Sequence, residues 1–428
     1  HKTRSPWTWV PTLYFAEGLP YVMVMTVSVI MYKRFGLSNT EIALYTSWLY
    51  LPWVIKPFWS PFVDILKTKR WWIIAMQLLI GGGLAGVALT LPTPFYLQAS
   101  LAFFWLLAFS SATHDIAADG FYMLALDDSQ QSFFVGIRST FYRLAMITGQ
   151  GLLIILAGFL EQSTGKISLS WSITFFVLSG LFVAFFVYHN FILPYPAGDV
   201  ERKDQTPKKI LAEFVNTFAS FFSKKGIILA IAFMFLYRLA EAMLVKLASP
   251  FLIDAREEGG LALSTQEVGF VYGTVGVIAL TIGGIIGGIV ASQKGLKFWL
   301  WPMALAITLP NVAYVFLSMT QPDNIWWVNV AVAIEQFGYG FGFTAYMLYL
   351  IYFSEGEHKT AYYSICTGFM ALGMMLPGMA AGWIQEQLGY QHFFIFIMIC
   401  TIPTLLLVPF MKIDPEFGKK KINNQTGN

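Results

Sequence analysis

The sequence contains few charged residues: only 12% of its 428 residues are Asp, Glu, Lys or Arg, whereas a soluble domain usually has about 25%. Several long segments contain no charged residue at all, among them 71–113, 167–198, 268–293 and 298–322. A helix needs roughly 20 apolar residues to cross a bilayer, so the longest of these segments has room for two helices and a turn. This scarcity of charge excludes a soluble domain and indicates a polytopic α-helical membrane protein.

Cysteine is scarce as well, since the chain has two, Cys366 and Cys400. Both fall inside expected helices, where a buried free thiol is the usual state of an isolated cysteine. The sequence shows no Cys/His ligand cluster, no phosphate-binding loop and no hydrolase motif, so we expect no cofactor, no metal and no enzyme. A net charge of +3 does not favour nucleic acid as a partner. The first apolar segment begins at Trp7 and lacks a signal-peptide cleavage pattern.

Hydropathy and turn residues predict twelve membrane spans in an all-α polytopic fold. The spans fall at 7–33, 40–64, 71–91, 95–126, 134–160, 169–193, 226–253, 265–291, 296–319, 324–354, 359–386 and 389–411. In the longest gap, apolar residues recur at helical spacing between lysines, which predicts an amphipathic helix on the membrane surface. The resulting domains are an N-terminal six-helix bundle (1–193), a cytoplasmic linker with that helix (194–225), a C-terminal six-helix bundle (226–411) and a cytoplasmic tail (412–428).

The Lys and Arg residues outside these spans gather on one side of the membrane. If the N-terminus is cytoplasmic, most of them fall in the inside segments, above all in the linker and the tail. Because positive charge is enriched on the cytoplasmic side, both termini are predicted to be cytoplasmic, in a multi-pass protein of the inner membrane.

Motifs in both halves of the chain resemble one family. The sequence has Tyr-Phe-Ala-Glu-Gly-Leu-Pro at 14–20, Lys-Pro-Phe-Trp-Ser-Pro-Phe-Val-Asp at 56–64, Ala-Thr-His-Asp-Ile-Ala-Ala-Asp-Gly at 112–120 and Leu-Tyr-Arg-Leu-Ala-Glu-Ala at 236–242. Together these segments resemble the AmpG-type branch of the major facilitator superfamily, which also includes acetyl-CoA transporters; His114 stands where that branch usually has Gln. The segment around Asp64 is also similar to the superfamily's loop between spans 2 and 3, without its glycines, and that loop acts as a conformational latch.

The resemblance implies a major facilitator fold and secondary active transport by alternating access. In bacterial AmpG proteins the cargo is a cell-wall muropeptide, in eukaryotic relatives it is acetyl-CoA, and related permeases carry siderophores. We therefore expect proton-coupled import of a muropeptide-like amino-sugar or peptide solute by a monomer, whose partners are the solute, protons and the lipid bilayer. A siderophore or other organic-anion permease is the alternative within the fold. A membrane acyltransferase using acyl-CoA and a non-transporting receptor are alternatives from other classes.

Carboxylates occur on spans 1, 4, 7 and 10, the spans that line the central cavity in this fold. They are Glu17, Asp115 with Asp119, Glu241 and Glu335. Ionised groups inside hydrocarbon are costly and usually mark a pathway or a proton relay. Proton coupling needs a carboxylate whose pKa can move toward neutrality when it is desolvated or separated from a cation. All but Asp119 are predicted to couple, with Asp115 and Glu241 ranked first because a cation is near each.

The depths of these charges along their spans predict ion pairs. The expected pairs are Asp115 with Arg143, Asp119 with Arg138, Glu17 with Lys56, and Arg238 with Glu241. Each could gate the transporter or simply hold two helices together, and Lys56 could instead extend to the interface.

A cargo-binding set is predicted on the same cavity spans. Arg238 and Lys246 would bind an anionic cargo, since arginine suits bidentate recognition of carboxylate or phosphate. The remaining members are Tyr14, Tyr237, Tyr339, Tyr346 and His114. Sugar rings stack on aromatic side chains, although lipid-facing positions explain most aromatics in such a protein.

Overall fold

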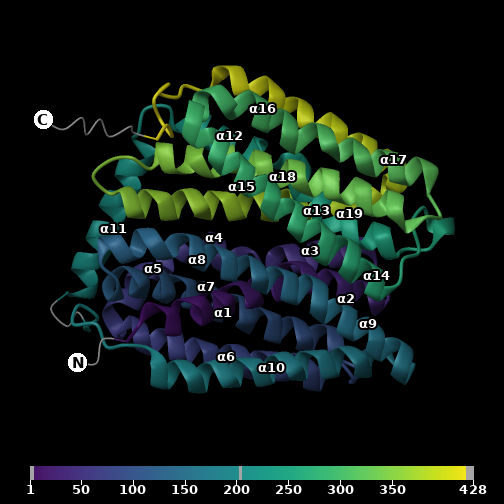
Figure 1. Ribbon diagram of the computed structural model, residues 1–428, viewed down its shortest axis with the longest axis horizontal. Coiled ribbons are helices and arrows are strands. Elements are labelled where there is room, and N and C mark those ends of the chain that lie inside the picture. Colours follow the sequence, from purple (N-terminus) through teal and green to yellow (C-terminus); the bar gives the residue numbers. More distant parts are fainter. Residues whose placement is uncertain (1–3, 202–204, 421–428) are drawn as a thin grey trace, which may run out of the picture.

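The structure is a computed structural model that describes residues 4–201 and 205–420, apart from a few side chains in two helices. The described residues form helices and no strand. The first and second halves of the chain form two bundles that lie side by side, with helices running along the long axis of the molecule (Figure 1). The expected all-helical fold is confirmed.

The first half contains thirteen helical elements before the linker. They are η1 Pro6–Thr8, α1 Val10–Val22, η2 Met23–Val27, α2 Ser28–Arg34, α3 Asn39–Trp48, α4 Leu51–Val54, α5 Lys56–Leu66, α6 Lys69–Thr90, α7 Tyr96–Ala125, α8 Asp128–Ile147, η3 Thr148–Leu152, α9 Leu153–Thr164 and α10 Ile167–Ile192. Of these, η2 and η3 are π-helical turns, a feature frequent at functional sites.

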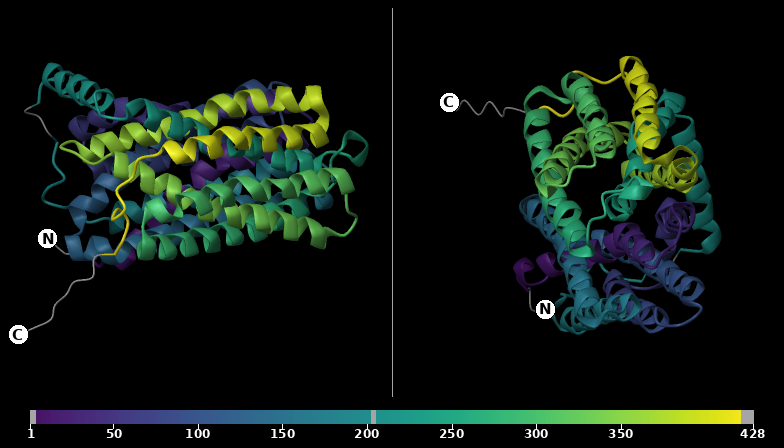
Figure 2. Two further views of the ribbon diagram at one scale, coloured as in Figure 1. Left: turned by 90° about the horizontal axis from the view of Figure 1, so that it is seen from above. Right: turned by 90° about the vertical axis from the view of Figure 1, so that its right-hand side faces the viewer.

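The linker helix α11, Pro207–Phe222, precedes the second half. The remaining elements are α12 Ile227–Leu236, α13 Leu239–Ile253, η4 Arg256–Glu258, α14 Thr265–Val268, η5 Gly269–Val275, α15 Gly276–Lys294, α16 Leu296–Thr308, η6 Leu309–Asn311, α17 Val312–Thr320, α18 Ile325–Phe353, α19 Lys359–Leu407 and η7 Val408–Phe410. Figure 2 shows α11 projecting at one end of the bundles, which we call the linker end. The other end is called the far end.

Nine segments of the described chain are long and apolar enough to cross a membrane. The segment Lys359–Phe410 covers two expected spans, and its helix is interrupted at Gly389, where φ is 75°, at the boundary expected from the sequence. Expected span 2 is broken into α3, α4 and α5, and expected span 10 is the single helix α18. The number twelve therefore stays a prediction.

Prolines explain the breaks in span 2. Pro52 and Pro57 each lie in the first turn of a new helical segment, where a missing N–H costs least, whereas the same residues would disrupt a continuous helix. The break in span 7, between α12 and α13, has no proline and has a different cause that is described with the site.

The apolar core shows where the two halves meet. The largest cluster of buried apolar side chains continues from the first half into the second and includes residues near the far end, such as Met31 and Leu252. Two smaller clusters are separate: one belongs to the second half and the linker, and the other belongs to the first half. The halves therefore share a core at the far end and have their own cores toward the linker end.

Two glycines allow this close packing. A Cβ on Gly382 of α19 would lie 1.9 Å from the Asn39 carbonyl oxygen of α3. A Cβ on Gly273 of η5 would lie at the same distance from the Gln150 carbonyl oxygen of η3. Since atoms cannot approach so closely, any larger residue at either position would push the halves apart.

Candidate functional site

The first-half part of the site is a charged cluster between α1, α7 and α8. Arg138 forms an ion pair with Asp119 at 3.4 Å and donates a hydrogen bond to the Tyr14 hydroxyl at 3.1 Å. Tyr14 in turn donates to Asp119 at 3.3 Å. The structure thus contains the pair expected between Asp119 and Arg138, and it adds Tyr14. Both charged side chains are about one-third exposed, so solvent reaches this cluster.

Glu17 lies beside this cluster, with its Oε2 atom buried and without a hydrogen-bond partner among the described residues. The expected ion pair between Glu17 and Lys56 does not form within the described part of the chain. The helix α1 packs along α8, which places Glu17 on the same side as Arg138 and its partner Tyr14. Lys56 lies at a depth in its span that would allow a pair with Glu17. Depth alone does not determine which face of the helix carries the side chain, and for this reason the prediction was wrong.

The expected ion pair between Asp115 and Arg143 is also wrong for this structure. Asp115 instead accepts a hydrogen bond from the Trp53 indole at 3.2 Å, and its Oδ1 atom is buried without a partner among the described residues. Arg143 extends to the second half, where its guanidinium lies 3.4 Å from the position of a Cβ on Gly284. Matching depth in two helices does not determine which face each side chain occupies, and α8 turns Arg143 toward α15.

His114 does not face the space between the halves, contrary to the expectation. It is fully buried, and its Nε2 atom accepts a hydrogen bond from the Gln77 amide at 3.0 Å. Gln77 also accepts from His189 Nδ1 at 2.9 Å, and Thr12 contacts the other nitrogen of His189 at 2.8 Å. Adjacent helical residues point about 100° apart, so His114 enters the first bundle while Asp115 faces out of it. Sequence reasoning missed this polar chain because its members lie on four different helices.

The second-half part of the site surrounds Arg238. This residue lies between α12 and α13, is 8% exposed, and donates a hydrogen bond to the Tyr339 hydroxyl. Its guanidinium carbon lies 4.7 Å from the centre of the Phe343 ring and 5.4 Å from that of Tyr346. Its Nε atom has no partner within the described chain. The expected ion pair with Glu241 does not form, because aromatic groups of α18 hold the guanidinium.

Glu241 is a neighbour of Glu335 instead. Glu335 accepts a hydrogen bond from the Gln336 amide at 2.7 Å, and each of the two carboxyl groups has one buried oxygen without a partner among the described residues. Glu241 and Glu335 are 4% and 1% exposed. Two neighbouring carboxyl groups this deeply buried would repel each other if both were ionised.

Lys246 is separated from Arg238 rather than beside it. Eight helical residues correspond to about 12 Å along the axis, and Lys246 is 2% exposed at the contact with α3. Its Nζ donates to Thr46 at 3.1 Å and lies 5.1 Å from the Tyr50 ring centre. Lys246 has no ion pair with a described carboxylate. In this conformation it joins the two halves and does not share a cargo site with Arg238.

The predicted tyrosines divide into two groups. Tyr237 donates to the Gly342 carbonyl at 2.7 Å and Tyr346 to the Met234 carbonyl at 2.9 Å, and both are buried, so they brace the bundle. Tyr339 is half-buried beside Arg238. Trp53, which sequence reasoning missed, lies edge-on to Tyr21 at 5.2 Å. The side chain of Asp64 lies outside the described residues, so its latch role stays a prediction.

A polar network closes the far end. Lys33 pairs with Asp254 at 2.5 Å, and Asn39 donates to Gln385 at 2.7 Å and to Tyr390 at 2.8 Å. These contacts join the first half to the second. They were not expected from the sequence, because each member looks like an ordinary polar residue at the end of a span.

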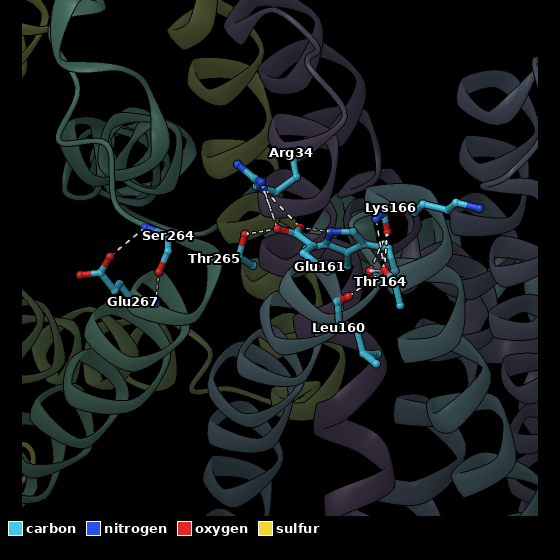
Figure 3. Close-up of polar contacts among 10 residues, drawn as sticks. Arg34, Leu160, Glu161, Thr164, Lys166, Ser264, Thr265 and Glu267 are labelled. Atoms are coloured by element: carbon cyan, nitrogen blue, oxygen red, sulfur yellow. Dashed lines mark hydrogen bonds and ion pairs between the residues drawn. The ribbon is translucent and has the colours of Figure 1, made fainter.

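A second set of contacts closes the far end beside this network. Glu161 accepts hydrogen bonds from Arg34 and from Thr265, each at 3.0 Å. Figure 3 shows the Glu161 carboxylate between the Arg34 guanidinium and the Thr265 hydroxyl. Glu161 also accepts from the Trp171 indole at 2.9 Å, so it has donors from both halves of the chain, and Thr265 ties α9 to α14 in this conformation.

Two helical bundles joined at one end, with apolar segments long enough to cross a membrane and buried charges within them, have the architecture of a membrane transporter. The sequence matches the profile of the Major Facilitator Superfamily over residues 12–355. The chain belongs to this superfamily: it is a multi-pass membrane transporter that handles small solutes, and its homologues are permeases, not enzymes.

Three comparisons define the relationship further. The chain is 28% identical to a Rickettsia conorii transporter named AmpG 4 over 422 residues, which cover 93% of this chain and 94% of that protein. It is 26% identical to the anhydromuropeptide permease of Escherichia coli over 424 residues, or 96% of this chain and 80% of the permease. A crystal structure of a nucleoside transporter NupG variant superposes with a TM-score of 0.72 at 14% identity, covering 94% of this chain and 99% of that chain. The resemblance to AmpG proteins is thereby confirmed, and the NupG match supports the fold alone.

Proposed function

We propose that this protein imports a muropeptide-like amino-sugar or peptide solute across the inner membrane by alternating access, driven by protons. The similarity to the E. coli anhydromuropeptide permease along 96% of the chain is the observation that carries the choice of solute. The Lys and Arg distribution favours a cytoplasmic linker end, and the closed far end then corresponds to a state open toward the cytoplasm. The transporter is proposed to act as a monomer.

The buried carboxyl groups supply a route for proton coupling. The Glu241–Glu335 pair can hold one proton between two helices of the second half. Glu17 and Asp115 each have a buried oxygen without a partner among the described residues, so each can gain a hydrogen-bond donor when the halves move. A change of conformation that alters these partners changes the affinity for a proton, which links proton binding to the movement.

A siderophore or another organic anion is the second candidate for the solute. The buried Arg238 guanidinium without a carboxylate partner favours an anion of some kind. Arginine binds carboxylate and phosphate alike, so this feature by itself does not distinguish the two solutes.

Uptake into proteoliposomes with an imposed inward proton gradient tests the proposal. Anhydro-muropeptide and a ferric siderophore would be offered in parallel to the wild type and to the Asp115→Asn and Glu241→Gln variants. We expect gradient-driven accumulation of the muropeptide by the wild type and its loss in both variants. If only the siderophore accumulates, the muropeptide is rejected as the solute and a siderophore takes its place in the proposal. Accumulation that does not depend on the gradient would reject proton coupling.

A further inference from the structure

The break in span 7 leaves backbone donors exposed in the middle of the membrane segment. Arg238 lies near the centre of the segment Ile227–Ile253, and α13 begins at the next residue. The Ala242 N–H bonds to the Arg238 carbonyl, but the Arg238 N–H does not bond to the Met234 carbonyl, and the Glu241 N–H does not bond to the Tyr237 carbonyl. Orphan N–H groups at this depth require a partner, since hydrocarbon offers none.

The break is held open by the neighbouring helices. The carbonyl of Met234 accepts a hydrogen bond from Tyr346, and the carbonyl of Leu236 accepts one from Thr404 at 2.6 Å. A continuous helix would give these carbonyls to N–H groups four residues later. At Met234 the Tyr346 hydroxyl takes the place of the Arg238 N–H, so α12 ends without a proline and the Arg238 N–H is left without this acceptor.

Arg238 supplies a second, independent sign of a missing ligand. The residue is 8% exposed, its Nε atom has no partner within the described chain, and its guanidinium donates a hydrogen bond to the neutral hydroxyl of Tyr339. A buried guanidinium is costly unless a negative charge balances it. Glu241, the nearest acid in the sequence, forms no ion pair with this guanidinium, which contacts the Tyr339 hydroxyl instead.

We propose that the break in span 7 is an anion-binding subsite, in which Arg238 and the N-terminal N–H groups of α13 bind a carboxylate of the transported solute. A helix N-terminus carries roughly half a positive charge and favours an anion, and the arginine adds a full charge at the same turn. The aromatic rings of Tyr339 and Phe343 bound the subsite on the α18 side. This inference rests on the proposed function, because it assigns a role to one group of the solute.

Binding to purified, full-length protein in nanodiscs tests the subsite. The probes are N-acetylglucosaminyl-anhydro-N-acetylmuramic acid, which carries a free lactyl carboxylate, and the same disaccharide with that carboxylate converted to a carboxamide. Loss of a charged hydrogen-bond partner usually costs a ten- to hundred-fold change in affinity, roughly. We expect the acid to bind the wild type at least about ten-fold more tightly than the amide, and Arg238→Gln to remove this preference without changing the affinity for the amide.

Two control variants distinguish loss of the subsite from loss of folded protein. Arg238→Lys retains the positive charge but lacks the planar, bidentate guanidinium, so it should show an intermediate preference for the acid. Lys166→Gln removes an exposed cation near the far end and should behave as the wild type. If the wild type binds acid and amide equally, or if Arg238→Gln weakens both to the same degree, the subsite is rejected.

A smaller probe separates this inference from the choice of solute. Lactate and lactamide at millimolar concentration would be compared for their effect on the Tm of the wild type and of Arg238→Gln. If neither disaccharide binds but lactate raises the Tm of the wild type alone, the subsite stands and the muropeptide is excluded. If lactate and lactamide have the same effect on the wild type, the subsite is rejected.

Discussion

Neutralising Asp254 should shift the transporter toward a conformation that is open at the far end. Asp254 pairs with Lys33 at 2.5 Å and accepts a hydrogen bond from Tyr390 at 2.5 Å. The paired side chains of Lys33 and Asp254 are 12% and 9% exposed. The pair joins the two halves, so it stabilises the closed far end and is lost when the halves separate there.

The size of the shift follows from the burial of this pair. Removing one partner of a buried ion pair costs about 3–5 kcal/mol. Asp254→Asn keeps an acceptor for Tyr390 and the pair is partly reached by solvent, so about 2 kcal/mol is a reasonable expectation. At 1.36 kcal/mol per factor of ten, this corresponds to roughly a thirty-fold change in the conformational equilibrium. Water would solvate Lys33 in the open state, so the penalty applies to the closed state.

Distances between spin labels at the far end measure this equilibrium. Labels at Lys166→Cys and Asp323→Cys, exposed positions in different halves, would be placed in a chain with Cys400→Ser and with the buried Cys366 left in place. We expect Asp254→Asn to increase the population of long distances. The exchanged pair Lys33→Asp with Asp254→Lys should return it toward the wild type, and the exposed Glu257→Gln should leave it unchanged. Identical distributions for Asp254→Asn and the wild type would refute the reasoning.

Three further predictions concern other parts of the molecule. Glu335→Gln should abolish accumulation driven by a proton gradient while leaving solute exchange between the two sides intact, because the amide has the size of the acid but cannot gain and release a proton. Retained gradient-driven uptake would count against a coupling role for Glu335. His114→Leu should lower the free energy of unfolding by about 1–3 kcal/mol, since the buried amide of Gln77 loses its acceptor. The affinity for the solute should stay unchanged. A loss of affinity without a loss of stability would show that His114 belongs to the binding site. Gly273→Ala should reduce transport strongly, because the new Cβ would collide with the Gln150 carbonyl of the other half. Gly82→Ala is the control, since Gly82 has open space around it, and it should not reduce transport. Equal activities of the two variants would show that the contact between η3 and η5 is not tight.

The positions of the intramembrane charges could be read from the sequence because desolvating a charge is costly in any fold. This argument selected Glu17, Asp115, Glu241 and Glu335, of which Glu17, Glu241 and Glu335 are buried and Asp115 is half-buried; their role in coupling stays a prediction. The break at Gly389 was also predictable, since a short turn must separate two apolar runs of spanning length. The pairing of the charges was harder to predict: of the expected pairs, Asp119 with Arg138 forms, and the other three do not form in the described structure.

The sequence by itself determined a helical membrane protein, its approximate spans and the residues that carry unusual charge, because hydropathy and desolvation depend on composition along the chain. The tertiary structure alone decided which way each side chain points and what it meets. In the tertiary structure His114 points into the first bundle, and Lys246 donates to Thr46 where the two halves meet. Span 7 is interrupted at Arg238, where hydroxyl groups from α18 and α19 bond to its carbonyls. These outcomes depend on the rotation of each helix and on neighbours far away in sequence, and a linear pattern does not contain that information.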